Sequence, residues 1–375
     1  MEKNNAEKYR NFAVSIVIVT AFLMAALVLG ALLFLIAGAN PFRAYAVMLT
    51  QPLSGLFGIT EMMVRAAPLM LVGLGIAIAF RSGILNIGGE GQIMVGVVLG
   101  TAVGLALPDV PKPLLVPIVF LSAFVGGGIW GGIAGWMRAY LNVNEILSTV
   151  MLNYIAIQIY LYLLRGPMID PAEVAYGTGV PQSAMLSQNA WLSRFIPGFR
   201  LHSGLVIAIG LAIVVFLFLW KTTVGYRMRA VGAEPKAATY AGMNVKHHLV
   251  LAMVLSGGFA GMAGAVEVMG VHHRALESIT ANYGFSGIVV ALFGGLHPLG
   301  IIPASMVFGL LIVGADMMQR AVDVPASIIL AIQGLIIMAI VSSYLFLRNP
   351  KFRERLRLLL GGKKAAERTP EGGRA

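Results

Sequence analysis

The segment from Leu71 to Ala106 constrains this chain more than any other. It is apolar enough to cross a membrane twice, yet its middle reads RSGILNIGGEGQ at residues 81–92. A carboxylate such as Glu90 costs about 3 kcal/mol at the centre of a membrane-spanning helix. The glycines on either side weaken any helix that would carry it. A segment of this kind is more typical of a transport pathway than of a membrane anchor.

The composition of the whole chain is also that of a membrane protein. Hydrophobic residues make up 58% of the 375 residues and charged residues 11%, against roughly 45–50% and 25% in soluble proteins. We therefore predict an all-α membrane protein. Apolar stretches long enough to span a bilayer indicate about ten transmembrane helices, at 13–37, 63–80, 84–107, 114–137, 146–164, 203–220, 249–270, 284–296, 299–318 and 326–346.

The pattern of interruptions suggests internal symmetry. Spans two to five and spans seven to ten start from opposite sides of the membrane. Each set contains an early glycine-rich interruption, at 83–91 and at 284–300. Paired interruptions in opposed halves are typical of inverted-repeat transporters. We predict an inverted repeat of two five-helix halves.

Basic residues set the predicted orientation, because cytoplasmic loops retain Lys and Arg. With an inside N-terminus, 19 of the 27 Lys and Arg residues fall in cytoplasmic segments. Both termini are then cytoplasmic, with a permease domain at 1–348 and a basic, partly disordered tail at 349–375. The first apolar stretch has about 24 residues, more than the 7–15 of a cleaved signal, and is predicted to be retained. Charge scattered beside the membrane explains the basic pI, so no nucleic-acid partner is expected.

Two connections are longer than the rest. The outer loop at 165–200 is rich in proline and glycine and is suited to docking rather than catalysis. The inner loop at 221–248 carries five basic residues and one acidic residue. Pro235 is predicted to start a short helix that continues over 236–243, with Glu234 beside its positive end. On composition alone, a solvated connecting loop explains this segment equally well.

Several kinds of chemistry are excluded. The chain has no cysteine, no HExxH motif and no GxxxxGK[ST] phosphate-binding loop. We therefore predict no catalytic site, no metal site, no cofactor and no ATP hydrolysis by this chain itself. Glycines spaced four residues apart at 96–104, 127–135 and 257–261 predict close helix contacts.

Polar residues within the spans are the candidates for a substrate pathway. Asn86 and Glu90 are four residues apart and would share a face if the segment were helical. The alternative for each such residue is a hydrogen bond that only holds the helices together. The predicted pathway residues are Asn86, Glu90, Gln92, Asn153 and Glu267.

Three motifs then carry a resemblance. RSGILNIGGEGQ at 81–92, VNEILSTVMLNYIA at 143–156 and GYRMRAVGAEPKAATYAGM at 225–243 resemble permease subunits of bacterial ABC importers in the branched-chain amino acid and ribose permease superfamily. Within it, the chain looks most similar to nucleoside and simple-sugar permeases that work with Bmp-type lipoproteins. The resemblance covers about residues 15–348 and implies a multi-pass protein of the bacterial cytoplasmic membrane.

The resemblance also implies partners. The motif at 232–243 matches the family's coupling segment for a cytoplasmic ATPase, and the matching residues are Gly232, Ala233, Glu234, Pro235, Lys236, Tyr240 and Gly242. A second homologous permease, as a heterodimer, and an extracytoplasmic substrate-binding lipoprotein are implied as well. The expected substrate is a small polar solute, a nucleoside or a simple sugar. An ion-coupled secondary transporter, with Glu90 as its proton site, is the alternative.

Overall fold

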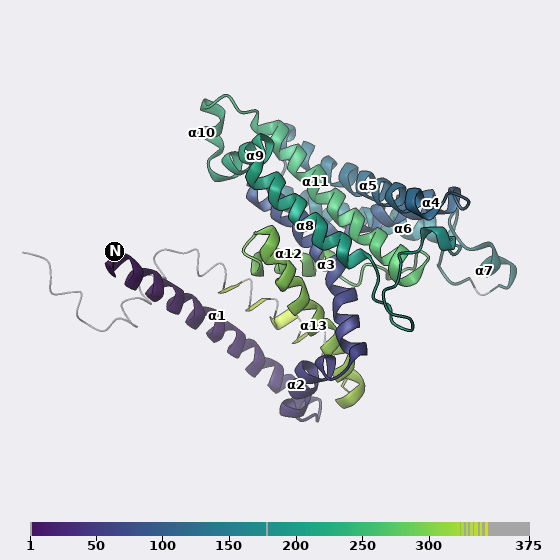
Figure 1. Cartoon of the computed structure of the whole chain (residues 1–375), viewed down its shortest axis with the longest axis horizontal. Helices are drawn as coiled ribbons and strands as arrows, with labels where there is room; N and C mark the ends of the chain where they lie inside the picture. The colour runs from purple at the N-terminus through teal and green to yellow at the C-terminus, as the bar shows by residue number, and fades with distance from the viewer. Residues whose placement is uncertain are drawn as a thin grey trace, which may run out of the picture. The chain divides into compact units, whose positions relative to one another are not determined.

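The computed structural model describes residues 2–177 and 179–322, together with isolated residues between 324 and 343. In these residues the chain is helical, with three isolated β-bridges and no β-strand (Figure 1). The chain forms two compact units, one of which is Ala46–Met317. The other combines Met1–Tyr45 with Met318–Ala375. Every site residue predicted above lies in the unit Ala46–Met317.

Seven helices among the described residues are long and apolar enough to cross a membrane. They match seven of the predicted spans, which confirms an all-helical, multi-pass membrane protein. The seven are α3 (Leu56–Arg81), α4 (Gly89–Ala106), α5 (Lys112–Leu141), α6 (Glu145–Arg165), α8 (Gly204–Lys221), α11 (Val245–Val266) with its continuation to His272, and α13 (Pro298–Val322).

The remaining predicted spans have different outcomes. The first lies in α1 (Glu2–Ile36), which makes an eighth span if it is counted together with α2 (Pro41–Thr50). The eighth predicted span, at 284–296, corresponds to α12 (Tyr283–Phe293). Its 11 residues cover about 16 Å, half of a bilayer core. The tenth, at 326–346, and the tail at 349–375 lie mostly or wholly outside the described residues. The count of ten and the inverted repeat stay predictions.

Short helices occupy the connections. The outer loop contains α7 (Pro171–Ala175) and a 3-10 turn, η2 (Gln188–Ala190), and a second such turn, η1 (Gln51–Leu53), precedes α3. The inner loop forms α9 (Thr223–Ala233) and α10 (Pro235–Tyr240). The inner loop is therefore largely helical, whereas most of the described residues of the outer loop are irregular.

The loops predicted to share a side of the membrane do meet. A cleft of about 560 Å³ is lined by Gly83, Asn142 and Pro235, from three loops predicted to be cytoplasmic. Near the opposite ends of these helices, the Asn189 side chain donates a hydrogen bond to the Pro108 carbonyl at 3.2 Å. The helices from α3 to α11 therefore alternate in direction as predicted.

Glycines set the closest helix contacts. A Cβ added at Gly257 of α11 would overlap the Gly127 carbonyl of α5, and one at Gly96 of α4 would overlap the backbone of Gly261. The three helices thus approach backbone to backbone, and they lie side by side in Figure 1. The glycine spacing in the sequence predicted these contacts correctly.

Each predicted interruption contains a break in the helices, although most of the second one, 284–300, is helical. The chain leaves the helix after Arg81 and re-enters one at Gly89, and Gly83 has a φ of 80°, which glycine adopts without strain. The second break is the turn between α12 and α13, where Gly295 has a φ of 67° and Leu296 a φ of 54°. These breaks place non-helical backbone between apolar helices.

Substituting Gly257 by alanine should destabilise the protein by about 1–3 kcal/mol, because backbone atoms of α5 would have to move. The matched control is Gly210→Ala in α8, where a Cβ meets nothing within 4 Å. Thermal unfolding of both variants in detergent measures the difference. Equal midpoints for the two variants would contradict the backbone contact.

Candidate functional site

The break between α3 and α4 is held by buried amide side chains. The Asn86 side-chain NH2 donates to Gln92 Oε1 at 2.9 Å and to Ser256 Oγ of α11 at 2.8 Å. Its Oδ1 accepts from the Gly88 amide at 2.9 Å and from Gln92 Nε2 at 3.0 Å. Asn86 therefore pairs with both the turn and a neighbouring helix.

Asn153 of α6 closes the same break from another side. Its Oδ1 accepts from the Gly91 amide at 2.8 Å, and its Nδ2 donates to the Ile87 carbonyl at 3.0 Å. One side chain thus satisfies two backbone groups that have no helical partner. Backbone groups inside a membrane protein need such partners, because lipid offers none.

Glu90 lies in the first turn of α4 and is 4% exposed. Its Oε1 accepts a 2.8 Å hydrogen bond from the Gly284 amide at the start of α12. The positive end of α4 favours a carboxylate at this position. Residues 84–88 are not helical, so Asn86 and Glu90 do not share a helix face, and their partners lie on different helices.

Four predicted pathway residues, Asn86, Glu90, Gln92 and Asn153, are therefore brought together around one turn. Glu267 has a different place, because it opens a π-helical turn, η3 (Glu267–His272), at the end of α11. It is 1% exposed, and its Oε2 lies 3.5 Å from His272 Nε2. A pathway role for all five residues stays a prediction.

The predicted coupling segment forms two consecutive helices. Pro235 occupies the first turn of α10, as predicted, and Glu234 precedes it as the N-cap residue without a side-chain capping bond. The helix ends at Tyr240 rather than Met243, because Gly242 adopts a φ of 76°. Tyr240 is 94% exposed, and Ala233, Glu234, Pro235 and Lys236 are exposed as well.

The end of α9 packs directly on the break after α3. A Cβ added at Gly232 would overlap the Arg81 carbonyl, and one at Gly83 would lie 2.9 Å from the Gly232 Cα atom. No side chain separates the two backbones. The predicted coupling segment and the predicted pathway break are therefore in direct contact.

Sequence reasoning missed a cluster beside this contact. The Arg81 guanidinium donates to the carbonyls of Leu296 and Gly295, both at 3.0 Å, and lies 5.5 Å from the centre of the Trp220 ring. Arg229 of α9 faces the same ring at 5.3 Å. Cation–π contacts of this kind stabilise by about 0.5–2 kcal/mol. The cluster joins the ends of α3 and α8 to α9 and to the turn before α13.

The site thus consists of a break between two apolar helices, α3 and α4, that is held by buried amide side chains and contacts the exposed polar segment α9–α10. This arrangement is that of a multi-pass membrane transport protein. The chain belongs to the family described as branched-chain amino acid transport system / permease component, whose model matches residues 58–341. This confirms the resemblance seen in the sequence, and the family is a transport permease rather than an enzyme.

Individual relatives agree with this assignment. The chain is 35% identical over 338 residues to the glucose ABC transporter permease protein TsgB13 of Haloferax volcanii, with 87% of each chain covered. It is 33% identical to the guanosine ABC transporter permease protein NupP of Bacillus subtilis, with 84% of this chain and 90% of the relative covered. A second guanosine permease of that organism, NupQ, is 27% identical over 66% of this chain and 78% of its own.

Replacing Asn153 by alanine should lower the stability of the folded protein. The Gly91 amide and the Ile87 carbonyl would lose their partner in a buried site, and each such group costs about 1–3 kcal/mol. Asn189→Ala is the control, because Asn189 makes its hydrogen bond to Pro108 at an exposed site. Thermal midpoints in detergent compare the two. A midpoint for Asn153→Ala as high as that of the control would mean that other groups satisfy the break.

Proposed function

We propose that this chain is the membrane permease of an ATP-binding-cassette importer that carries a nucleoside, or a simple sugar, across the bacterial cytoplasmic membrane. The observation that carries the proposal is the family match over residues 58–341, joined by relatives named for guanosine and for glucose. Nucleosides and sugars both present several hydroxyl groups to their binding sites. A nucleoside is the first candidate.

The ATPase is a separate subunit that docks on α10. In support, this chain has no phosphate-binding loop, and α10 projects an exposed Tyr240 beside Lys236. Aromatic residues dominate many small interfaces, because they bury a large area with little loss of side-chain freedom. The cleft lined by Pro235, Thr239 and Lys246 lies next to this helix and offers further room for a protein contact.

Two further partners complete the transporter. The existence of two guanosine permeases in one organism, NupP and NupQ, both similar to this chain, supports a heterodimer of homologous permeases. An extracytoplasmic lipoprotein delivers substrate to the outer face, where the loop at 165–200 lies. That loop is tied to the end of α11 by the Leu186 amide, which donates to the His273 carbonyl at 2.8 Å.

The orientation of the chain follows from the docking side. If α10 faces the cytoplasmic ATPase, then the ends of α3, α5 and α8 are cytoplasmic as well, in agreement with the basic residues there. Both termini lie in the cytoplasm under this arrangement. The loop at 165–200 and the π-helical turn η3 then lie toward the extracytoplasmic side of the membrane.

Transport uses the contact between α9 and the break after α3. Closure of the ATPase moves α10, and Gly232 passes this motion to Arg81 and Gly83 because their backbones touch. The Arg81–Trp220–Arg229 cluster carries the same motion to the turn before α13. Both breaks then shift together, and access to the pathway alternates between the two sides of the membrane.

Uptake into proteoliposomes tests the proposed function. Vesicles containing this permease, its partner permease and the ATPase, with lipoprotein outside, should accumulate radiolabelled guanosine or glucose only when ATP is enclosed. Collapsing ion gradients with ionophores should leave uptake unchanged. Uptake that needs an ion gradient and ignores ATP would overturn the proposal in favour of a secondary transporter.

Replacing both Glu234 and Tyr240 by alanine should weaken the association with the ATPase or uncouple ATP hydrolysis from uptake. Helix α10 itself should persist, since the Glu234 side chain makes no capping bond. Tyr176→Ala is the control for association with the ATPase, because Tyr176 is 83% exposed and lies in the outer loop, on the other side of the membrane. Copurification and uptake per ATP hydrolysed measure the effect. Wild-type values for both would show that this loop is only a connection.

A further inference from the structure

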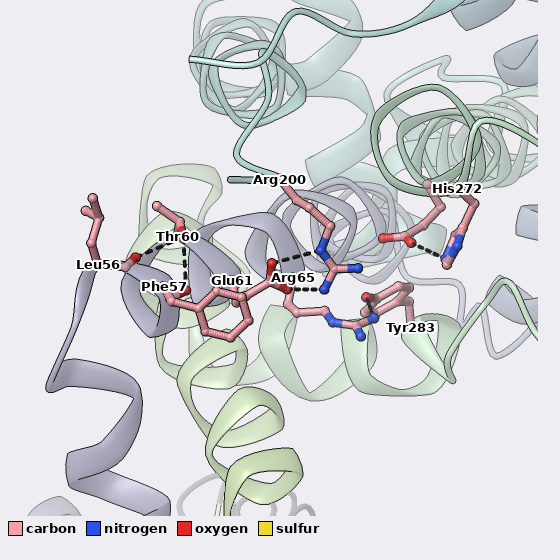
Figure 2. A network of polar contacts seen from close by, with 9 residues as sticks. Leu56, Phe57, Thr60, Glu61, Arg65, Arg200, His272 and Tyr283 are labelled. Atoms are coloured by element: carbon pink, nitrogen blue, oxygen red, sulfur yellow. Dashed lines mark hydrogen bonds and ion pairs between the residues drawn. The ribbon is translucent and has the colours of Figure 1, made fainter. Parts of the chain in front are cut away.

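A cluster of polar side chains from four segments lies away from the break and close to the π-helical turn η3 (Figure 2). Glu61 of α3 accepts two hydrogen bonds from Arg200 of the outer loop, at 2.9 and 2.5 Å. One turn further along α3, Arg65 Nη1 donates to the Tyr283 hydroxyl at 2.7 Å. Tyr283 is the first residue of α12, so its neighbour Gly284 is the residue that binds Glu90.

Glu267 is the member of this cluster that the protein leaves unsatisfied. Both carboxylate oxygens are buried and accept no hydrogen bond of ordinary geometry from the described residues, although the Tyr283 hydroxyl lies close enough to interact with the carboxylate. His272 Nε2 lies 3.5 Å from Oε2, longer than a good hydrogen bond but close enough for an ion pair when the ring is protonated. A buried carboxylate without hydrogen bonds costs several kcal/mol, so the cluster as it stands is incomplete.

A second unsatisfied group flanks the same turn. His202 Nδ1 accepts a hydrogen bond from the Gly204 amide at 3.1 Å, so in the neutral ring Nε2 carries the proton. Nε2 is buried without a partner among the described residues. A Cβ added at Gly270 of η3 would overlap this ring, which places His202 against the turn. Burial lowers the pKa of His202 to about 4, so the ring is neutral at physiological pH.

The backbone geometry points to the same place. The α-helix of α11 changes to a π-helix at Glu267 and ends at His272. Single π-helical turns occur frequently at functional sites, because the wider turn re-aims the side chains that it carries. Here it carries one unsatisfied acceptor and packs against one unsatisfied donor.

We propose that Glu267, Arg65 and His202 form the site at which the permease recognises adjacent hydroxyl groups of a neutral, polyhydroxylated solute, such as the ribose of a nucleoside or a simple sugar. The inference rests on the proposed function and adds the binding site and the recognised group. A carboxylate accepts hydrogen bonds from two neighbouring hydroxyls. Arg65 and His202 donate to the hydroxyl oxygens.

The charges of the cluster select a neutral ligand. The arginines Arg65 and Arg200 are balanced by Glu61 and Glu267, and the charge of Asp316 also acts on Arg65. The cluster therefore has no excess of positive charge to hold a phosphate group, which arginine would otherwise favour. The cluster therefore favours a neutral solute over a phosphorylated sugar or a nucleotide.

The site is reached from the side of the outer loop. The side chains of Arg200 and His272 are 43% and 31% exposed, whereas that of Glu267 is 2% exposed. Polar groups therefore lead from the surface to the buried carboxylate. A solute that follows them next meets the first turn of α12, whose Gly284 amide holds Glu90.

Paired substrates test this site in the complete reconstituted transporter. Initial uptake of guanosine is compared with that of 2′,3′-dideoxyguanosine, which lacks both ribose hydroxyls. If glucose rather than guanosine is imported, it is compared with 2-deoxyglucose. Wild type should prefer the hydroxylated solute. Glu267→Gln and Tyr283→Phe keep the side-chain volume and should both reduce this preference, the second because the Tyr283 hydroxyl positions Arg65. For Glu267→Gln the reduction should be about tenfold or more, which corresponds to the loss of a hydrogen bond to a charged group.

The control is Glu277→Gln, because Glu277 pairs with Arg165 at an exposed site and should leave the preference unchanged. A merely structural role for Glu267 would slow both solutes in proportion, so an unchanged ratio in Glu267→Gln and Tyr283→Phe would overturn the proposed site. Wild-type transporter that imports neither guanosine nor glucose would instead overturn the proposed function, and the site with it.

Discussion

The structure depends on satisfying the non-helical backbone between Arg81 and Gly89 inside a helix bundle. Lipid cannot provide hydrogen bonds, so a broken span requires partners from its own protein. Asn86 and Asn153 provide them, since both are buried and bond the Gly88 amide and the Ile87 carbonyl of the break. The break is therefore a built element with fixed partners on α6 and α11.

The same break touches both regions to which we assign a role in transport. On one side the break touches Gly232 without an intervening side chain. On the other side, Glu90 in the first turn of α4 accepts a hydrogen bond from the Gly284 amide. Motion of α9 thus has a short path to the start of α12. Tyr283, the residue before Gly284, accepts a hydrogen bond from Arg65 (Figure 2) and lies close enough to Glu267 to interact with it. The proposed coupling helix and the proposed recognition site are therefore connected through one helix end.

Much of this was visible in the sequence, because it depends on local patterns. Apolar length predicted the seven crossing helices, and glycine spacing predicted close helix contacts at Gly127 and Gly257, although not that these two residues meet. Pro235 predicted the start of α10. The end of α10 was placed too late, since Gly242 leaves the helix sooner than the polar pattern suggests.

The rest depends on which helices become neighbours. Arg200 and Glu61 are 139 residues apart, and Arg81 reaches carbonyls more than 200 residues away. A single sequence contains no local pattern that shows which of these distant residues lie close together in the fold. The expectation that Asn86 and Glu90 would share a face assumed a helix, whereas the glycines at 83 and 88 permit a turn.

The central claim is that the break moves together with the coupling helix. The chain has no cysteine, so spin labels can be attached at Leu85→Cys in the break and Lys236→Cys in α10, or at Lys236→Cys and Gln188→Cys in the outer loop. Pulsed electron paramagnetic resonance then measures the distance between each pair of spin labels in the complete transporter. With ATP bound, the account predicts an unchanged distance between positions 85 and 236 and a changed distance between positions 236 and 188. A change between 85 and 236 would contradict it.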